Sequence, residues 1–223
     1  MFKYDTHVHT SETSRCGKTP AVDVVRLYKA AGYDGIIITD HFCNSFFDSI
    51  QGETWAAKVD QFLDGYRQAL DEGNKIGLKV FLGIEILFEE NFNDYLIYGF
   101  DESFLYDNSG LCKLGLKNFK DFIKGSEIMT IQAHPFRRYI TPVDPGLLDG
   151  VEVYNGNPRH DSQNHLALQL ANRHNLIKSS GSDFHQIEDL AKGGIETQYP
   201  LKSIDDFVSV LKNADSYRLI IGD

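Results

Sequence analysis

Long apolar runs, basic charge and cysteine are all scarce in this chain. No apolar run approaches the roughly 18 residues of a membrane span, and the first five residues lead straight into a strand pattern without the features of an export signal. We therefore expect no membrane partner. Cys16, Cys43 and Cys112 are odd in number and form no CxxC pair, which favours a reducing, cytoplasmic location over a disulfide framework.

Basic residues are too few to balance the acidic ones. There are 22 Lys and Arg against 32 Asp and Glu, and the formal net charge is −10. This balance argues against duplex nucleic acid as a partner, because such binding needs a basic surface that displaces counterions from phosphates. Bound divalent cations would still make a site locally positive, and a small phosphorylated substrate senses that local charge.

Strand and helix patterns alternate along the chain. Strands are expected at 2–8, 35–39, 79–86, 95–100, 128–133, 150–154, 176–180 and 217–221. Helices are expected near 20–32, 55–72, 117–124, 161–174 and 203–213. No linker, repeat or low-complexity segment interrupts the pattern, so residues 1–223 are expected to form one α/β domain. Seven or so strands with interleaved helices favour a distorted (β/α) barrel over an open sheet.

Side chains of the kind that bind metals follow several of these strands. His7 and His9 project from one face of the first strand, because successive side chains point to opposite faces, so both imidazoles can reach one ion. Asp183 and His185 repeat the spacing near the other end of the chain. The strand-end residues are Asp40, His41, Glu85, His134 and Asp183. In a barrel these strand ends share one rim, where active sites lie, so a metalloenzyme is predicted.

These motifs resemble those of the PHP (polymerase and histidinol phosphatase) family of metal-dependent phosphoesterases, in their order and across nearly the whole chain. The matching segments are DTHVHT at 5–10, ITDH at 38–41, GIE at 83–85, AHP at 133–135 and GSDFH at 181–185. The resemblance implies a distorted (β/α)7 barrel. It also implies two or three divalent ions, Zn, Mn or Fe, at the carboxyl-terminal rim of the strands.

The resemblance further implies a division of the ligands among these ions. The first ion would be held by His7, His9, Glu85 and Asp183. Glu85 would bridge to a second ion held also by His134, and a third site would include His41 and His185. A bridging carboxylate suits hydrolytic pairs of ions about 3.5–4 Å apart. Glu85, Asp183 and His185 would be the catalytic residues, and either of the last two could orient or shuttle a proton.

The segment after the His-x-His departs from the family's pattern. Many members place a further His or Asp five or six residues after it, where this chain has Ser14 and Arg15, with Cys16 next. Cys16 or Glu12 could substitute, or Arg15 could place a positive charge near the substrate. Whether a third ion is held depends on this segment.

A second departure follows Glu85. Members often supply a His to the second ion from the next strand, and this chain has no His there. Asp94 or Asp101 could fill that role with oxygen, which would favour a harder ion such as Mn.

Cationic side chains near the rim are candidates for binding substrate phosphate: Arg15, Arg137, Arg138, Arg159 and His160. A guanidinium fork suits phosphate oxygens, although solvated arginines and a simple turn at 157–160 explain the same residues equally well. The long 42–54 loop carries three phenylalanines, which could wall a pocket, cover it as a lid or pack beneath the loop.

The combined prediction is a cytoplasmic metal-dependent phosphoric ester hydrolase. It would act on a small phosphomonoester or a nucleotide phosphate by attack of a metal-bound hydroxide. Three alternatives remain open: histidinol-phosphate phosphatase, hydrolysis of a C–N bond, and a metal-binding accessory domain without catalysis. The near-complete ligand set favours the enzyme.

Overall fold

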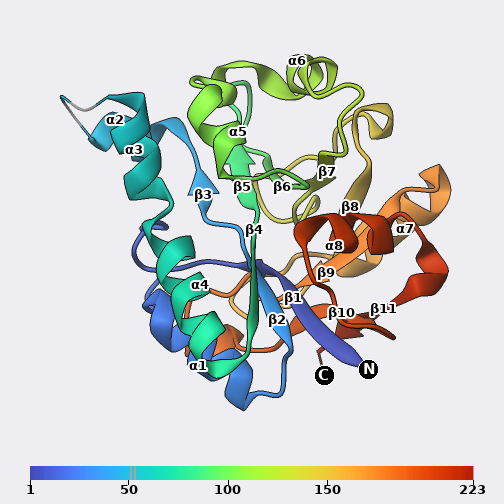
Figure 1. Ribbon diagram of the computed structural model, residues 1–223. Helices are drawn as coiled ribbons and strands as arrows, with labels where there is room; N and C mark the ends of the chain where they lie inside the picture. Colours follow the sequence, from blue (N-terminus) through green and yellow to red (C-terminus); the bar gives the residue numbers. More distant parts are fainter. Residues whose placement is uncertain (51, 53, 223) are drawn as a thin grey trace.

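The strands form two sheets in the computed structural model, which describes residues 1–50, 52 and 54–222 (Figure 1). The five-stranded sheet has the order β11 (Tyr217–Ile221), β10 (Gly193–Thr197), β1 (Phe2–Val8), β2 (Gly35–Ile38) and β4 (Lys79–Leu82). The six-stranded sheet has the order β3 (His41–Phe42), β5 (Ile84–Leu87), β6 (Asp94–Tyr98), β7 (Met129–Gln132), β8 (Gly150–Asn155) and β9 (Ile177–Gly181).

The mixed α/β fold is confirmed, but the strand pairing among the described residues does not show a closed (β/α)7 barrel. β1, β2 and β4 run parallel, whereas β6 is antiparallel to both β5 and β7, and β10 is antiparallel to both β1 and β11. The sheets are linked near the ends of β1 and β5. Glu85 N–H donates to the Asp40 carbonyl at 3.1 Å, and Val8 forms a parallel bridge with Phe184.

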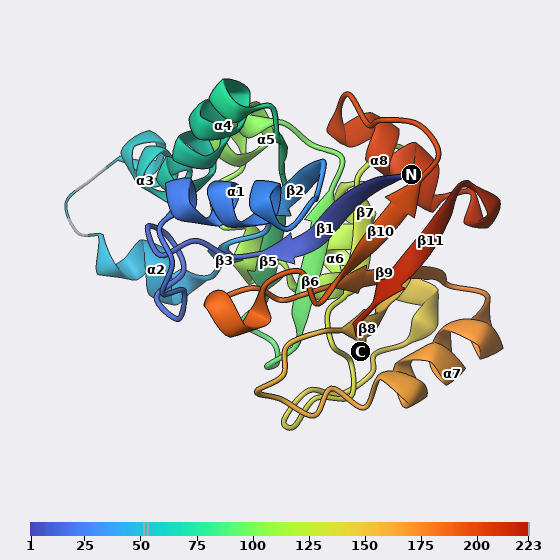
Figure 2. The same cartoon turned by 90° about the horizontal axis from the view of Figure 1, so that it is seen from below.

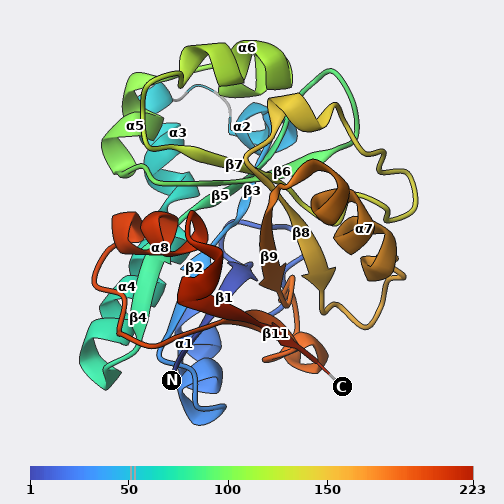
Figure 3. The same cartoon turned by 90° about the vertical axis from the view of Figure 1, so that its right-hand side faces the viewer.

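The helices lie on the outer faces of the sheets (Figures 2 and 3). They are α1 (Ala21–Ala30), α2 (Asn44–Ser49), α3 (Trp55–Phe62), α4 (Asp64–Ile76), α5 (Glu102–Asp107), α6 (Gly115–Phe122), α7 (Asn164–His174) and α8 (Ile204–Leu211). α1 packs against α4 beside β2 and β4, and α7 packs against β8 and β9. None of the helices in the described part of the chain has the length and apolar character needed to cross a bilayer.

The core between the two sheets is built from the inward side chains of alternating strand positions. Its members include Tyr4, Ile37, Leu96, Ile131 and Ile195, with Phe207, Val208 and Leu211 of α8 packed among them. Tyr4 lies in this core near the start of β1, whereas His7 lies near the end of the same strand. The ligand-type side chains therefore gather at one end of the core, and the start of β1 packs with α8 at the other.

Two glycines explain a strand that the sequence patterns miss. No strand is predicted at 193–197, because the pair Gly193-Gly194 is typical of a turn. In the structure, a Cβ on Gly193 would lie 2.3 Å from the backbone of Gly181, and Gly194 has a φ of +136° with the Tyr4 carbonyl 2.3 Å from its would-be Cβ. The missing side chains let β10 lie close to its neighbours.

Candidate metal centre

Four side chains converge where the first ion is predicted. His7 and His9 come from the end of β1, Glu85 from β5 and Asp183 from the turn after β9. His7 Nε2 lies 3.3 Å from Glu85 Oε1 and 3.5 Å from Asp183 Oδ1, and His9 Nε2 lies 3.4 Å from Glu85 Oε2 and 3.4 Å from Asp183 Oδ1. These separations match the edge, about 3.4 Å, of a tetrahedron whose ligands lie about 2.1 Å from its centre.

Buried polar atoms that have no hydrogen-bond partner among the described residues lie at the same place. They include His7 Nε2, His9 Nε2 and Glu85 Oε2. Leaving such an atom unsatisfied costs about 1–3 kcal/mol, so native proteins rarely do so. A divalent cation would engage all three atoms, and this mixture of imidazole and carboxylate donors suits Zn, Mn or Fe. The donor set therefore fits a metal ion.

Two of the candidate ligands have a strained backbone conformation. His134 has a φ of +28° and Asp183 a φ of +52°, although neither is glycine. Such left-handed conformations cost on the order of 1–3 kcal/mol and persist where the surroundings impose them. Both residues follow strands of the six-stranded sheet, so the strain turns their side chains toward Glu85 and His7, respectively.

The second predicted ion position is bounded by Glu85, His134 and Asp94. His134 Nε2 lies 3.1 Å from Glu85 Oε1, and the ligand atoms of Asp94, Glu85 and His41 all lie within 4.8 Å of one another. Burial and the nearby Glu85 raise the pKa of Asp94 to about 6. A cation would relieve this repulsion between like charges.

The other candidate for that position, Asp101, lies elsewhere. Its carboxylate accepts a 3.0 Å hydrogen bond from Ser103 N–H and caps the start of α5. The structure therefore brings Asp94, and not Asp101, to the centre.

The third predicted position is surrounded by imidazoles. The ligand atoms of His9, His41 and His185 lie within 4.8 Å of one another, and the ring of His9 is centred 4.4 Å from that of His41 and 4.2 Å from that of His185. Cys16 Sγ lies 3.1 Å from His185 Nε2. Burial alone would raise the pKa of the Cys16 thiol, but hydrogen bonds with His185 and His41 outweigh it and lower the pKa to about 6.

Neighbouring polar groups orient the His7 and His9 rings. His7 Nδ1 lies 2.9 Å from Glu152 Oε1, and because a carboxylate only accepts, Nδ1 carries a proton and Nε2 is the nitrogen that a metal ion would bind. His9 Nδ1 lies 3.1 Å from the Ser14 hydroxyl, which donates to Asp40 at 2.7 Å. Glu152 is not among the predicted site residues, although a charged residue inside an apolar strand is the signal that could have found it.

The protonation states follow from this crowding. Burial would raise the pKa of Glu85, but His7 and His41 hold it well below its usual range. Burial, together with His185 and His41, lowers the pKa of His9 well below its usual value. Burial would also lower the pKa of His7, but Glu152 and Glu85 raise it well above the usual value. His9 is therefore ready to bind a metal, whereas binding by His7 would release a proton.

Arg137 and Arg159 are both engaged within the protein. Arg137 donates to Asp183 Oδ2 at 2.7 Å and to Asn155 Oδ1 at 2.7 Å, so it holds one carboxylate oxygen and leaves Oδ1 facing the histidines. Arg159 forms a two-point pair with Asp189, with distances of 2.7 and 3.2 Å. Asp189 accepts the His185 N–H at 2.9 Å, so this pair secures the turn that carries His185.

The other predicted substrate contacts lie at the surface. Arg138 stacks over the exposed Tyr139 ring at 4.7 Å. His160 is exposed, and partial burial together with Arg137 lowers its pKa. Arg15 is exposed and has no hydrogen bond or ion pair to the residues that the structure describes. Of the four arginines considered, Arg15 is the one left without a protein partner within that part of the chain.

A cavity of about 260 Å³ opens beside the third position. His41, Cys16 and Asp94 line one part of it, Arg15 another, and Phe46 and Leu87 supply apolar wall. The predicted 42–54 loop contains β3 and α2, and its residues 51 and 53 lie outside the described residues. Phe46 of this loop lines the cavity beside the third position, while Phe42 and Phe47 are buried in the core.

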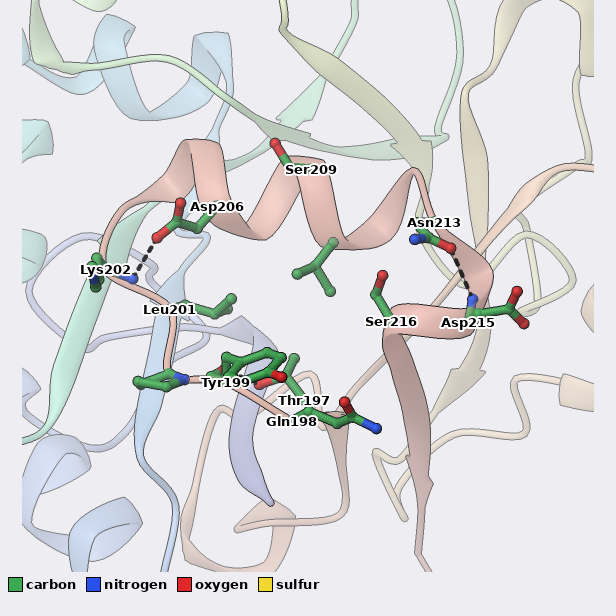
Figure 4. Close-up of a pocket in the computed structure, with 12 residues that line it drawn as sticks. Thr197, Gln198, Tyr199, Leu201, Lys202, Asp206, Ser209, Asn213, Asp215 and Ser216 are labelled. Atoms are coloured by element: carbon green, nitrogen blue, oxygen red, sulfur yellow. Dashed lines mark hydrogen bonds between the residues drawn. The ribbon is translucent and has the colours of Figure 1, made fainter.

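A larger cavity of about 530 Å³ lies between the β10–α8 loop and the segment that follows α8 (Figure 4). Lys202 N–H donates to Asp206 at 2.8 Å, and Asp215 N–H donates to Asn213 at 3.2 Å. These polar groups are used to close turns, and the described residues that line this cavity include no histidine or cysteine. We assign it no chemistry.

The family model of the PHP domain matches residues 5–204. The chain belongs to the PHP family. This confirms the family that the five motifs predict. No curated protein sequence matches the chain.

Solved structures share this PHP fold. A two-domain protein from Bacteroides vulgatus that contains a predicted PHP-like metal-dependent phosphoesterase is 17% identical, with a TM-score of 0.67; the alignment covers 99% of this chain and 65% of that one. A protein from Bifidobacterium adolescentis, assigned as a metal-dependent phosphoesterase, is 19% identical, with a TM-score of 0.55. The alignment covers 94% of this chain and 95% of that one. An amidohydrolase from Chromobacterium violaceum, solved with sulfate and no metal, is 18% identical, with a TM-score of 0.58. The alignment covers 93% of this chain and 96% of that one.

Replacing Glu152 by Gln is expected to weaken metal binding about 10–100-fold, the usual effect of losing a carboxylate that supports a histidine ligand. Glu152 supports two ligands, because its Oε1 lies on His7 Nδ1 and its Oε2 accepts the His134 N–H at 3.1 Å. Competition against a chromophoric chelator measures the affinity. Glu196→Gln, on β10, is the control, and equal affinities for both variants would contradict the supporting role.

Proposed function

We propose that this PHP protein is a metal-dependent phosphoesterase that hydrolyses a small phosphomonoester or a nucleotide phosphate. The observation that supports this most directly is the position of Glu85. Its Oε1 faces His7 and His134, while its Oε2 faces His9 and His41. A carboxylate shared in this way is how hydrolytic centres hold two ions about 3.5–4 Å apart.

Bound divalent ions would supply the Lewis acidity that activates water as the nucleophile and neutralises phosphoryl oxygens. The protein's own groups would position the reacting partners. Arg137 holds Asp183 so that Oδ1 faces the histidines, and the pair of Arg159 with Asp189 holds the turn of His185. Because Asp183 Oδ2 already accepts from Arg137, we assign Asp183 to ligand binding and not to proton transfer.

The size of the cavity beside the centre favours a substrate with a small leaving group. Its volume of about 260 Å³ lies below the roughly 300–1,000 Å³ typical of pockets that enclose drug-sized ligands. Phe46 and Leu87 offer apolar contact, and Arg15 offers a cation that has no partner among the described residues. The Chromobacterium relative binds sulfate, a tetrahedral dianion like a phosphoryl group. A small phosphorylated metabolite in a reducing cytoplasm is the partner that we propose.

Replacing Arg15 by Ala is expected to raise KM about tenfold and to change kcat little, because a hydrogen bond to a charged group contributes about 1.5–3 kcal/mol when it forms. Steady-state kinetics on any turned-over phosphomonoester measures both constants. Arg138→Ala is the control, since Arg138 stacks on Tyr139. A loss confined to kcat would show that Arg15 acts on the reaction and not on binding.

The proposed function is tested with the protein freed of metal by chelation and reloaded separately with Zn, Mn or Fe. Phosphomonoesters including histidinol phosphate, phosphodiesters, nucleotides and amide substrates form the panel. We expect phosphate release that depends on the metal and is greatest for small monoesters. Metal bound tightly without any phosphate release would reject the proposal in favour of an accessory role, and amide hydrolysis alone would favour C–N chemistry.

A further inference from the structure

We propose that Cys16 is a metal ligand, and that with His41 and His185 it makes the third position a sulfur-containing site, chemically different from the two nitrogen and oxygen sites. This inference rests on the metal centre of the proposed function. Cys16 would supply the ligand in the segment where the chain departs from the family's pattern.

Ser14 and Glu12, which lie near Cys16 in the sequence, already make other contacts. The Ser14 hydroxyl donates to Asp40 at 2.7 Å, accepts the His41 N–H at 3.0 Å and lies 3.1 Å from His9 Nδ1. It therefore supports the ligands and is not free to bind an ion. Both carboxylate oxygens of Glu12 lie 3.0 Å from Ala21 N, at the start of α1. Glu12 is thus fixed at the helix end.

Cys16 instead points at the two histidines. Its Sγ lies 3.1 Å from His185 Nε2, and the ligand atoms of His185 and His41 lie within 4.8 Å of each other. The opposite ring nitrogens face other groups: His185 Nδ1 lies 2.9 Å from the Asp183 carbonyl oxygen, and His41 Nδ1 lies 2.9 Å from Glu85 Oε2. Two imidazole nitrogens and one sulfur therefore face a common point.

A second observation points to an ion at this place. The ligand atoms of His9, His41 and His185 lie within 4.8 Å of one another, and the buried His9 ring packs against those of His41 and His185. Imidazole nitrogens gathered in this way, with a sulfur beside them, form a donor set that suits a transition-metal ion. His41 and Cys16 also line the cavity, which leaves this side of the site open to a substrate.

The sulfur sets the metal preference. Thiolate selects softer ions such as Zn over Mn, whereas the carboxylate of Asp94 at the second position suits Mn. We therefore expect the third position to take Zn or Co in preference to Mn.

Cobalt reports sulfur ligation directly, because a thiolate bound to Co²⁺ gives a charge-transfer absorption band in the near ultraviolet. We expect this band when the metal-free protein is titrated with Co²⁺. Cys16→Ser should lose the band and about one equivalent of bound metal per chain. Cys43→Ser and Cys112→Ser should keep both. Cys16→His should lose the band but keep the metal, since imidazole replaces the thiolate as a ligand.

A band that persists in Cys16→Ser, or no band in the cobalt-saturated wild type, would overturn the inference. If Cys16→Ser does not fold, the Cys16→His comparison still decides, because only ligation predicts retained metal without the band. The result is separate from that of the proposed function. A cobalt band without hydrolysis would reject the enzyme alone, and hydrolysis without the band would reject Cys16 alone.

Discussion

Glu85→Gln is expected to remove bound metal and turnover together. Glu85 is buried at the middle of the centre, where its two oxygens lie 3.3 Å from His7 Nε2, 3.4 Å from His9 Nε2, 3.1 Å from His134 Nε2 and 2.9 Å from His41 Nδ1. The amide would replace one of these oxygens by an NH₂ group, which cannot bind a cation. Lewis-acid stabilisation contributes several kcal/mol, so turnover should fall by about a thousandfold or more.

Elemental analysis and phosphate release, measured on the same preparation, check this expectation. Glu90→Gln is a matched control, because the Glu90 carboxylate accepts the Leu116 N–H at 2.9 Å outside the centre. A Glu85→Gln protein that keeps its metal and its turnover would show that the carboxylate is structural.

Arg137→Met is expected to lower the free energy of unfolding by about 3–5 kcal/mol in the metal-free protein. Removing the guanidinium leaves the buried carboxylate of Asp183 without a compensating charge. Asp183 is buried, which alone would raise its pKa, but His7 and Arg137 hold the pKa well below its usual range. Without Arg137, one carboxylate oxygen loses its 2.7 Å contact. A bound cation would compensate for part of this charge, so the loss should be smaller in the metal-loaded protein.

Urea unfolding measures the loss of unfolding free energy in both states, with excess chelator for the metal-free protein and with saturating Zn for the metal-loaded protein. A carboxylate with a depressed folded-state pKa stabilises the protein above its unfolded pKa of about 3.9, and this contribution is lost as the pH falls. The difference between Arg137→Met and the wild type should therefore narrow below about pH 4. Arg138→Met is the control. Equal losses with and without metal would show that Asp183 does not face a bound ion.

Several elements were predictable because they depend on local patterns. The strand expected at residues 2–8 is β1, and His9, directly after it, turns its Nε2 toward Glu85 and Asp183 as His7 does. Strands followed by ligand-type side chains occur at β2, β7 and β9 as expected, whereas Glu85 lies within β5. The five motifs predicted the PHP family, which the match over 5–204 confirms.

Other elements were not predictable, because distant contacts determine them. The expected helix at 55–72 is two helices that meet at Leu63, and this break lets Gly65 approach Thr10 so closely that a Cβ there would lie 2.1 Å from the Thr10 hydroxyl. The expected strand at 79–86 divides at Gly83 into β4 and β5, which belong to different sheets. A single strand pattern carries no information about which sheet each half joins.

The sequence by itself determined the family and the kinds of ligand, because residue type and spacing along a strand are local properties. The tertiary structure decided which of the alternative ligand residues reach the metal centre. Antiparallel pairing of β5 with β6 brings Asp94 near Glu85, while Asp101 caps a helix. The turn after β1 engages Ser14 with Asp40 and directs Cys16 toward His185. These choices depend on contacts between segments far apart in the chain, and only the folded structure makes those contacts.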